Sequence, residues 1–277
     1  MGEKLTWWRG LLVFSAVTIA GATVWSAVRG KGAATAALAS LEGPPGERVS
    51  GPLISVVIPT WNEADYLGDL LTSLANQTYE PLEFIIADWN STDETREVAA
   101  SFGAKVVDVL ERGVGPARNV GAAAATGEFL LFIDADNILE PTLVEDLMVE
   151  LLSRDTLITH PRIAYYEGSG MYHATRWMSA AVMPSHNTTR CVLIRREAFD
   201  ATGGYPNIWR EDLWLGAKVR ELFGSGAIAY LPYAICATST RREVARFQER
   251  WTPVKSPYFP AVRNGIYQLP APEAGGI

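Results

Sequence analysis

Two aspartates separated by one residue, Asp134 and Asp136, are the side chains of this sequence best suited to chemistry. They follow the apolar run Phe129–Ile133, which comes after a turn signal at Ala125–Gly127 and indicates a buried strand. If the strand continued through them, both aspartates would point to the same face. Carboxylates that close repel each other unless a cation or a donor lies between them. The pair therefore predicts a divalent-metal site for a phosphate-bearing substrate. The alternative is a helix cap and a surface carboxylate before the helix expected after Pro141.

The elements that must position this pair alternate between strand and helix patterns. Apolar, β-branched runs predict strands at Leu53–Pro59, Leu82–Trp89 and Lys105–Val109 ahead of the Phe129 strand. Helical spacing of leucines predicts a helix from about Leu67 to Gln77, and a Ser91–Glu94 capping box predicts the start of the next. This order indicates an α/β fold with a parallel sheet covered by helices. Ligands bind such sheets at the carboxyl ends of the strands.

The chain after Arg154 has a looser pattern. Strands are expected at Ile158–Tyr166, Arg190–Arg195 and Ala227–Ala237. Helices are expected at Glu197–Ala201, Glu211–Phe223 and Thr238–Trp251. The Glu211–Phe223 helix would begin with two adjacent carboxylates, Glu211 and Asp212, which point about 100° apart on a helix.

Composition narrows the functional class. The chain has 277 residues, a net charge of −7 and a sequence pI of about 5.1. It has no basic stripe with interleaved aromatics, so a nucleic-acid partner is not expected. The two cysteines, Cys191 and Cys236, form no disulfide framework or metal-ligand spacing, and they are expected as buried thiols of a reducing compartment.

The N-terminal region predicts a membrane anchor. Gly10–Val28 holds nineteen residues without a charge. As a helix it would span roughly 29 Å, close to the thickness of bilayer hydrocarbon. A cleaved signal peptide is the alternative, because small residues follow at Ala33–Ala39. The expected organisation is an anchor at 1–31, a linker at 32–52, a globular domain at 53–251 and a C-terminal extension at 252–277.

Five motifs in order resemble those of the family-2 glycosyltransferases, which have a GT-A fold and are mostly inverting. Pro59–Glu63 (PTWNE) is similar to the family's P-T-Y-N-E, and Asp88–Asp93 (DWNSTD) to its D-D-G-S-T-D. Ala117–Glu128 (ARNVG, then ATGE) is similar to A-R-N-x-G followed by A-x-G-E, and Asp134–Asp136 to D-x-D. Arg196–Asp212 is similar to R-x-x-F, G-G-F and E-D in succession. The match covers about Leu53 to Arg242. It departs from the pattern at Trp89 and Asn90, where the family has Asp and Gly.

The resemblance implies a metal-dependent, inverting transfer of a sugar from a nucleoside-diphosphate sugar. Asp136 would bind Mn²⁺ or Mg²⁺, with Asp134 on the ribose or on the metal. Asp212 would be the general base, and Glu211 would bind the acceptor or orient a neighbour. The remaining members of the nucleotide pocket would be Pro59, Thr60, Asn62, Glu63, Asp88 and Arg118.

Each assignment has a structural alternative. Thr60, Asn62 and Glu63 are also ordinary turn residues, and Arg118 could pair with a site carboxylate rather than with phosphate. Glu211 and Asp212 could simply complement a helix dipole. Two other functions remain open: a sugar nucleotidyltransferase, and an inactive scaffold that binds sugar or nucleotide. The anchor makes a lipid-linked acceptor plausible, and the donor's cytosolic supply places the domain on the cytoplasmic side of the cell membrane.

Overall fold

A computed structural model describes residues 48–154, 156–165, 190–208 and 211–239, all within one compact unit, Pro45–Ile277. The predicted anchor, most of the linker, the Thr238–Trp251 helix beyond Ser239 and the C-terminal extension lie outside these residues. Among the described residues, no helix is both long and apolar enough to cross a membrane.

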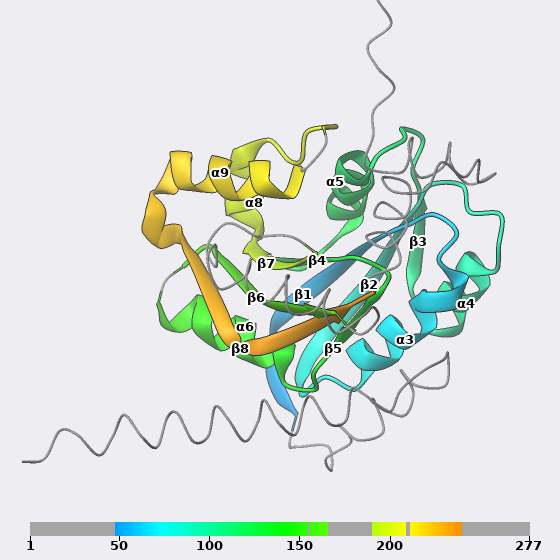
Figure 1. Ribbon diagram of the computed structural model, residues 1–277, viewed down its shortest axis with the longest axis horizontal. Coiled ribbons are helices and arrows are strands. Elements are labelled where there is room, and N and C mark those ends of the chain that lie inside the picture. Colours follow the sequence, from blue (N-terminus) through cyan, green and yellow to red (C-terminus); the bar gives the residue numbers. More distant parts are fainter. Residues whose placement is uncertain (1–47, 155, 166–189, 209–210, 240–277) are drawn as a thin grey trace, which may run out of the picture. The chain divides into compact units, whose positions relative to one another are not determined.

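The first half of the described chain builds the parallel part of an eight-stranded sheet (Figure 1). Its strands lie in the order β3-β2-β1-β4, and all three pairings are parallel. The strands are β1 (Val49–Thr60), β2 (Tyr79–Asp88), β3 (Lys105–Asp108) and β4 (Phe129–Ile133). The helices that connect them are α3 (Ala64–Ala75), α4 (Thr95–Ser101) and α5 (Val114–Ala124). This half confirms the predicted alternation of strand and helix.

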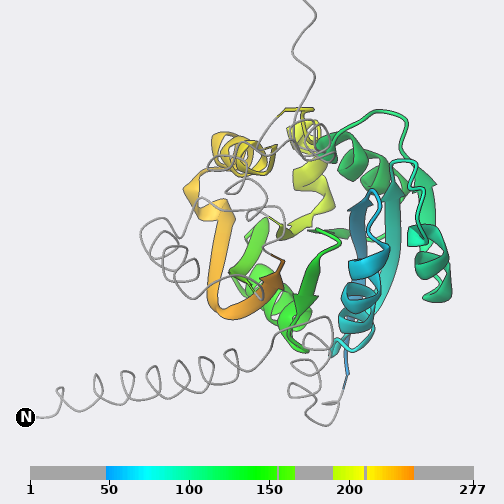
Figure 2. The ribbon, with the colours of Figure 1, turned by 45° about the vertical axis from the view of Figure 1, so that its right-hand side comes forward.

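The second half of the sheet, for which the sequence predicts strands but no pairing direction, is mixed. From β4 the order continues β7-β6-β8-β5, with antiparallel pairings at β4–β7, β7–β6 and β8–β5 and a parallel pairing at β6–β8. These strands are β5 (Asn137–Leu139), β6 (Ile158–Tyr165), β7 (Cys191–Arg195) and β8 (Ile228–Thr238). Figure 2 shows the bend in β8, which pairs with β6 along its length and whose last three residues also pair with β5.

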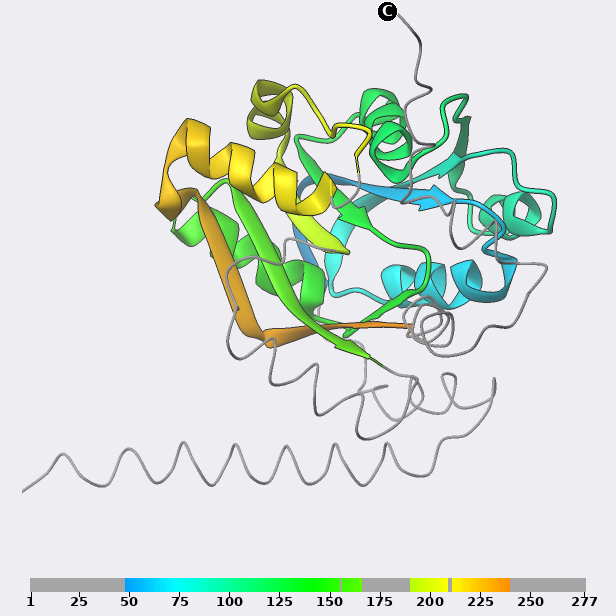
Figure 3. The same ribbon diagram turned by 45° about the horizontal axis from the view of Figure 1, so that its top comes forward.

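Helices cover both faces of the sheet (Figure 3). One face packs against α3, α4 and α6 (Leu143–Ser153), and the other against α5, α8 (Arg196–Thr202) and α9 (Glu211–Phe223), which is followed by the short 3₁₀ helix η1 (Ser225–Ala227). The alternation of strand side chains sets this division. Leu131 and Ile133 of β4 face the first group, while Leu130 and Phe132 face the second.

Several element boundaries differ from the predicted ones. β1 begins at Val49, within the predicted linker, whereas α6 begins at Leu143, shortly after Pro141 as expected. The Ser91–Glu94 capping box does not form: Glu94 occupies the N-cap of α4 without a side-chain bond, and Ser91 instead bonds Asp88. Both cysteines are fully buried thiols, as expected, and burial, together with the neighbouring Cys191 thiol, raises the pKa of Cys236.

Candidate functional site

The polar side chains singled out by sequence gather at the carboxyl edge of the parallel strands. Thr60 ends β1, Asp88 ends β2, and Asp134 follows β4 directly. The chain runs from β1 out to β3 and then returns to the other side of β1 at β4, so the connections reverse direction between β1 and β4. Open α/β sheets bind ligands at such a switch point.

Asp134 and Asp136 lie on a tight turn and not on a continued strand. β4 ends at Ile133, and the backbone N–H of Asn137 donates to the Asp134 carbonyl at 3.2 Å, which closes the turn. The side chains of both aspartates are nonetheless buried, at 3% and 1% exposure. β5 then pairs with β8, and the N–H of Ser239 donates to the Asp136 carbonyl, so the turn is anchored from the far end of the sheet.

Arg118 connects this turn to the start of α9. Its Nη2 donates to Asp134 Oδ1 at 2.9 Å and its Nη1 to Glu211 Oε1 at 2.7 Å. All three side chains are about 97% buried, and the guanidinium also lies over the Tyr205 ring, 5.1 Å from its centroid. The alternative of a salt bridge to site carboxylates is therefore what the structure shows for Arg118, and it places the arginine inside the site.

Glu211 and Asp212 form the first turn of α9, where the helix dipole favours negative charge. Burial raises the pKa of both carboxyls, and the Arg118 guanidinium opposes the rise. Asp212 Oδ1 accepts the N–H of Leu213 at 2.7 Å. A buried carboxylate with a raised pKa is better suited to accept a proton than an exposed one.

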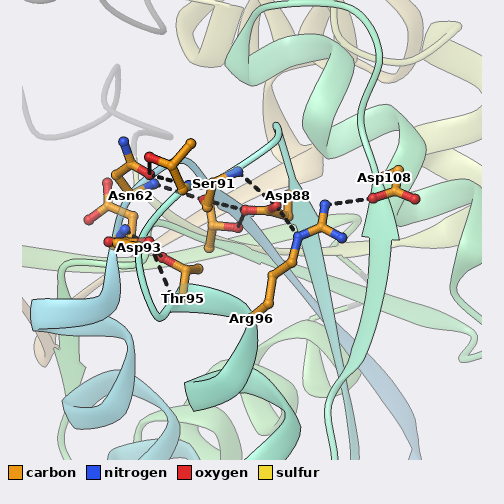
Figure 4. Close-up of polar contacts among 10 residues, drawn as sticks. Asn62, Asp88, Ser91, Asp93, Thr95, Arg96 and Asp108 are labelled. Atoms are coloured by element: carbon orange, nitrogen blue, oxygen red, sulfur yellow. Dashed lines mark hydrogen bonds and ion pairs between the residues drawn. The ribbon is translucent and has the colours of Figure 1, made fainter.

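Asp88 is a fully buried carboxylate that accepts four hydrogen bonds (Figure 4). Oδ1 accepts from Thr60 Oγ1 at 3.0 Å and from the Ser91 hydroxyl, and Oδ2 accepts from the Ser91 N–H at 3.1 Å. The fourth donor is Nε of Arg96 at 2.7 Å, and Nη2 of the same arginine reaches Asp108 at 2.6 Å. Asp88 thus ties together the ends of three neighbouring strands.

The loops after β1 and β2 are bonded to each other. Asn62 Oδ1 accepts the Thr92 N–H at 2.8 Å, and the Asn62 N–H donates to the Ser91 hydroxyl at 2.9 Å. Asn90, in the place of the family's glycine, has φ = 50°, a conformation that asparagine adopts more readily than most residues. Pro59 pairs with Ala87 inside the sheet. The Glu63 side chain is only 3% exposed, so it is not an exposed turn carboxylate.

Two tryptophans line the same edge beside Asp88. The Trp61 and Trp89 rings are 5.1 Å apart, and the Arg112 guanidinium lies over both, at 5.9 and 5.0 Å from their centroids. Trp89 stands where the family pattern has aspartate. The departure therefore replaces a charge with an aromatic surface capped by a cation.

The donor set at the turn fits a divalent metal that also binds substrate. No group of three or more His, Cys, Asp or Glu side chains that could hold a metal occurs in the part of the chain that the structure describes. Asp134 and Asp136 supply only two carboxylates, which suits Mg²⁺ or Mn²⁺, because these ions take few protein ligands and complete their shell with water and phosphate oxygens.

Sequence reasoning missed two arginines of this region. Arg96 was missed because the residue spacing does not show that its side chain, on α4, reaches the ends of β2 and β3. Arg190 was expected only as the first residue of a strand. The antiparallel pairing of β7 with β4 brings it to the Asp134 turn, where its carbonyl accepts the Asp134 N–H at 3.1 Å.

The sheet order and the acidic centre at its switch point define an α/β domain of the class that binds ligands at the carboxyl edge of its sheet. Comparison with known proteins gives the family. Residues 55–214 match the sequence profile of Glycosyl transferase family 2, which is more than half of the chain, and the chain therefore belongs to that family.

Relatives and solved structures agree with this assignment. The chain is 33% identical over 109 residues to the glycosyltransferase GlyG of Streptococcus pneumoniae, covering 37% of this chain and 36% of that one. It is 27% identical over 173 residues to an uncharacterized glycosyltransferase of Haemophilus influenzae, covering 58% and 69%.

Two crystal structures illustrate the likeness in fold. S. aureus TarS 1–349 has a TM-score of 0.57 at 19% identity, covering 71% of this chain and 63% of that one. Glucosyl-3-phosphoglycerate synthase from Mycobacterium tuberculosis, in complex with Mn²⁺, UDP and glucosyl-3-phosphoglycerate, has a TM-score of 0.53 at 23% identity, covering 80% and 84%. Several curated relatives are matched over only about a third of their own length, 36% for GlyG.

Proposed function

We propose that this chain transfers a sugar from a nucleoside-diphosphate sugar to an acceptor, with inversion at the sugar carbon and with Mn²⁺ or Mg²⁺ bound. The observation that carries the proposal is the ion-pair bridge of Arg118, which joins the Asp134–Asp136 turn to the Glu211–Asp212 pair at the switch point of the sheet. A donor site and a proton acceptor are thereby held in one buried centre.

The charges of this centre support the metal. Asp134, Asp136, Glu211 and Asp212 carry four negative charges when ionised, and Arg118 and Arg190 carry two positive ones, which leaves two negative charges. Among these described side chains, a divalent cation would offset the excess of negative charge. A bound Mn²⁺ or Mg²⁺ would neutralise the charge that develops on the diphosphate as the bond to the sugar breaks. Asp136 is the proposed direct ligand, and Asp134, which also accepts from Arg118, lies on the ribose or on the metal.

The other side chains have separate tasks. Asp212 takes the proton of the acceptor hydroxyl on the face of the sugar opposite the diphosphate, and Glu211 is held beside it by Arg118. If the acceptor is an ionised phosphate, Asp212 orients it instead. Asp88, with Thr60, Asn62 and Glu63, shapes the nucleotide end of the site. UDP-sugar complexes are known for the structural neighbours TarS and glucosyl-3-phosphoglycerate synthase, which supports a nucleotide-sugar donor here.

The test is thermal stabilisation by a panel of nucleoside diphosphates, with and without Mn²⁺, on the wild-type chain and on Asp136→Ala. We expect one nucleoside diphosphate to raise the melting temperature of the wild type only when Mn²⁺ is present. This stabilisation should be lost in Asp136→Ala. Hydrolysis of a matching panel of sugar nucleotides then identifies the sugar. Metal-independent binding that Asp136→Ala leaves intact would refute the metal site, and binding without any transfer or hydrolysis would favour the inactive scaffold.

We further propose that the acceptor is lipid-linked and that the domain works on the cytoplasmic side of a membrane. The apolar run Gly10–Val28 supports this placement, and it lies outside the described residues. Reporter fusions at the C-terminus test it. An active extracellular fusion would contradict it.

A further inference from the structure

Arg190 has an unusual backbone conformation beside the acidic centre. Its φ is 76°, in the left-handed region that side chains other than Gly, Asn and Asp rarely adopt. Among the described residues, the other non-glycine positions with positive φ are Asn62 and Asn90, for which this conformation is ordinary. Strained backbone persists where the surrounding structure holds it in place, and such positions cluster at functional sites.

The backbone of Arg190 has a clear structural task. Its carbonyl accepts both the Asp134 N–H, at 3.1 Å, and Asn137 Nδ2, at 2.8 Å, so it holds the turn that carries the aspartates from both ends. A glycine would aim the same carbonyl in the same direction without steric cost. The structural task therefore does not explain why an arginine stands there.

The side chain of Arg190 lies within the same centre. Its Nη1 donates to Thr238 Oγ1 at 3.2 Å, and Thr238 pairs with Asn137, the residue after Asp136. The guanidinium is also close enough to Asp212 for its charge to favour the ionised carboxylate. Arg190 thus contacts the Asp134–Asp136 turn through its carbonyl and carries its charge near the proposed base, and it is only partly buried.

We propose that Arg190 binds the diphosphate of the sugar donor and stabilises it as the leaving group. The inference rests on the proposed glycosyl transfer. A guanidinium grips phosphate oxygens through two parallel hydrogen bonds, and it shares with a divalent cation the task of neutralising their charge. The Arg118 side chain is about 97% buried, whereas Arg190 is only partly buried, so the guanidinium of Arg190 is the more accessible of the two to a phosphate group.

The decisive variant is Arg190→Gly, because it removes the guanidinium and relieves the strained φ together. The full chain is measured with Mn²⁺, using the nucleoside diphosphate that stabilises the wild type, and in parallel with the corresponding nucleoside. We expect a melting temperature at or above that of the wild type, unchanged nucleoside binding, and at least a tenfold loss in nucleoside-diphosphate affinity or in the rate of sugar-nucleotide hydrolysis. Added guanidinium ion at millimolar concentration should restore part of that rate.

Three companion variants complete the experiment. Arg190→Lys keeps the positive charge but cannot form two parallel hydrogen bonds to phosphate. Its nucleoside-diphosphate affinity and hydrolysis rate should lie between those of the wild type and of Arg190→Gly. Arg190→Asn keeps a residue that tolerates the left-handed region, and it replaces Arg190→Gly if the glycine variant fails to fold. Arg154→Ala removes an exposed arginine at the C-cap of α6 that pairs with Glu150, and its nucleoside-diphosphate affinity and hydrolysis rate should equal those of the wild type.

The outcomes separate the two proposals. A wild-type chain that binds no nucleoside diphosphate would overturn the proposed function, and this inference with it. A wild type that binds, together with a folded Arg190→Gly that binds and turns over equally well, would overturn the role of Arg190 alone. Equal losses for nucleoside and nucleoside diphosphate would also overturn it, because they would show a general distortion of the pocket.

Discussion

Single side chains join parts of this site that are far apart in the sequence. Arg118 bonds Asp134, 16 residues away, and Glu211, 93 residues away. Asp88 likewise gathers donors from the end of β1, from its own loop and from α4. Because Arg118 and Asp88 are both buried and charged, removing a partner of either one leaves a buried charge without compensation.

The Asp212 carboxyl should cost stability at neutral pH. Burial raises its folded-state pKa above the ordinary 3.8, and the Arg118 guanidinium only partly opposes this. A raised pKa means that the fold loses stability as the pH rises through that pKa, because ionisation is then less favourable in the folded chain than in the unfolded one. Asp212→Asn should therefore melt at a higher temperature than wild type at neutral pH while losing sugar transfer.

The advantage of Asp212→Asn should shrink as the pH falls below 3.8, where the aspartate is neutral in both states. Thermal unfolding followed by circular dichroism across the pH range measures this. A variant that melts below wild type at neutral pH would show that the Asp212 charge stabilises the fold.

Arg96 should stabilise the edge of the sheet through Asp88. Arg96→Ala leaves a fully buried carboxylate with one donor fewer and should lower the free energy of unfolding by about 1–3 kcal/mol. Arg96→Lys should recover only part of the lost free energy of unfolding, because an ammonium group cannot bond Asp88 and Asp108 together as the guanidinium does.

Urea unfolding measures the effect of Arg96, and Arg48→Ala is the matched control. Arg48 pairs with Glu80, but those side chains are 55% and 43% exposed, so its loss should cost no more than about 0.5 kcal/mol. Equal effects of the two variants would mean that the Asp88 pair contributes no more than a surface ion pair.

At the level of elements, the sequence is most informative where each element follows one period. The alternation of strands and helices from β1 to β4 is visible because apolar runs alternate with leucines at helical spacing. The antiparallel pairing of β7 cannot be predicted from the sequence, since a buried strand has the same composition in either direction. Arg190 was missed for this reason: its place at the site depends on the direction of β7.

The contact of α5 with β1 depends on a glycine. A Cβ at Gly121 would lie 2.4 Å from Val57 Cγ1, a fully buried methyl group. Gly121→Ala should therefore destabilise the domain by about 1–3 kcal/mol through overpacking. Because α5 also carries Arg118, we expect weaker nucleotide binding as well.

Gly68→Ala in α3 is the control for this contact. The nearest atom to its new Cβ would be Val98 Cγ1 at 3.8 Å, an ordinary contact. Alanine favours a helix interior over glycine by about 1 kcal/mol, so this variant should be neutral or more stable. Equal destabilisation by both substitutions, in chemical unfolding, would contradict the packing explanation for Gly121.

At the scale of the whole molecule, the catalytic unit should not need the N-terminal region. The described sheet begins at Val49, and Pro45–Ile277 forms a compact unit by itself. A chain without residues 1–44 should keep the melting temperature and nucleotide affinity of the full chain. If Gly10–Val28 is a membrane anchor, only the full chain should sediment with membranes. Loss of nucleotide binding on truncation would show that the N-terminal region contributes to the site.

Family membership could be inferred from five short motifs, because their order and the strand pattern agree. The individual contacts of the site could not. The motif that contains Arg118 gives no sign that the arginine is bonded to both Asp134 and Glu211. Asp88 was expected to face a ligand, but it accepts four hydrogen bonds from protein donors. Such contacts depend on where three loops and two helices meet, and residue spacing along one chain does not fix that meeting point.

The two buried cysteines can report local unfolding of the sheet. Cys191 on β7 and Cys236 on β8 are the chain's two thiols, and both lie in the mixed half of the sheet with no exposed surface. A fully buried thiol does not react with an alkylating reagent until the strands around it separate, and burial also raises the pKa of Cys236. The labelling rate therefore measures how often that half of the sheet opens, without any added probe. Slower labelling when nucleotide binds would show that the ligand holds the two halves of the sheet closed.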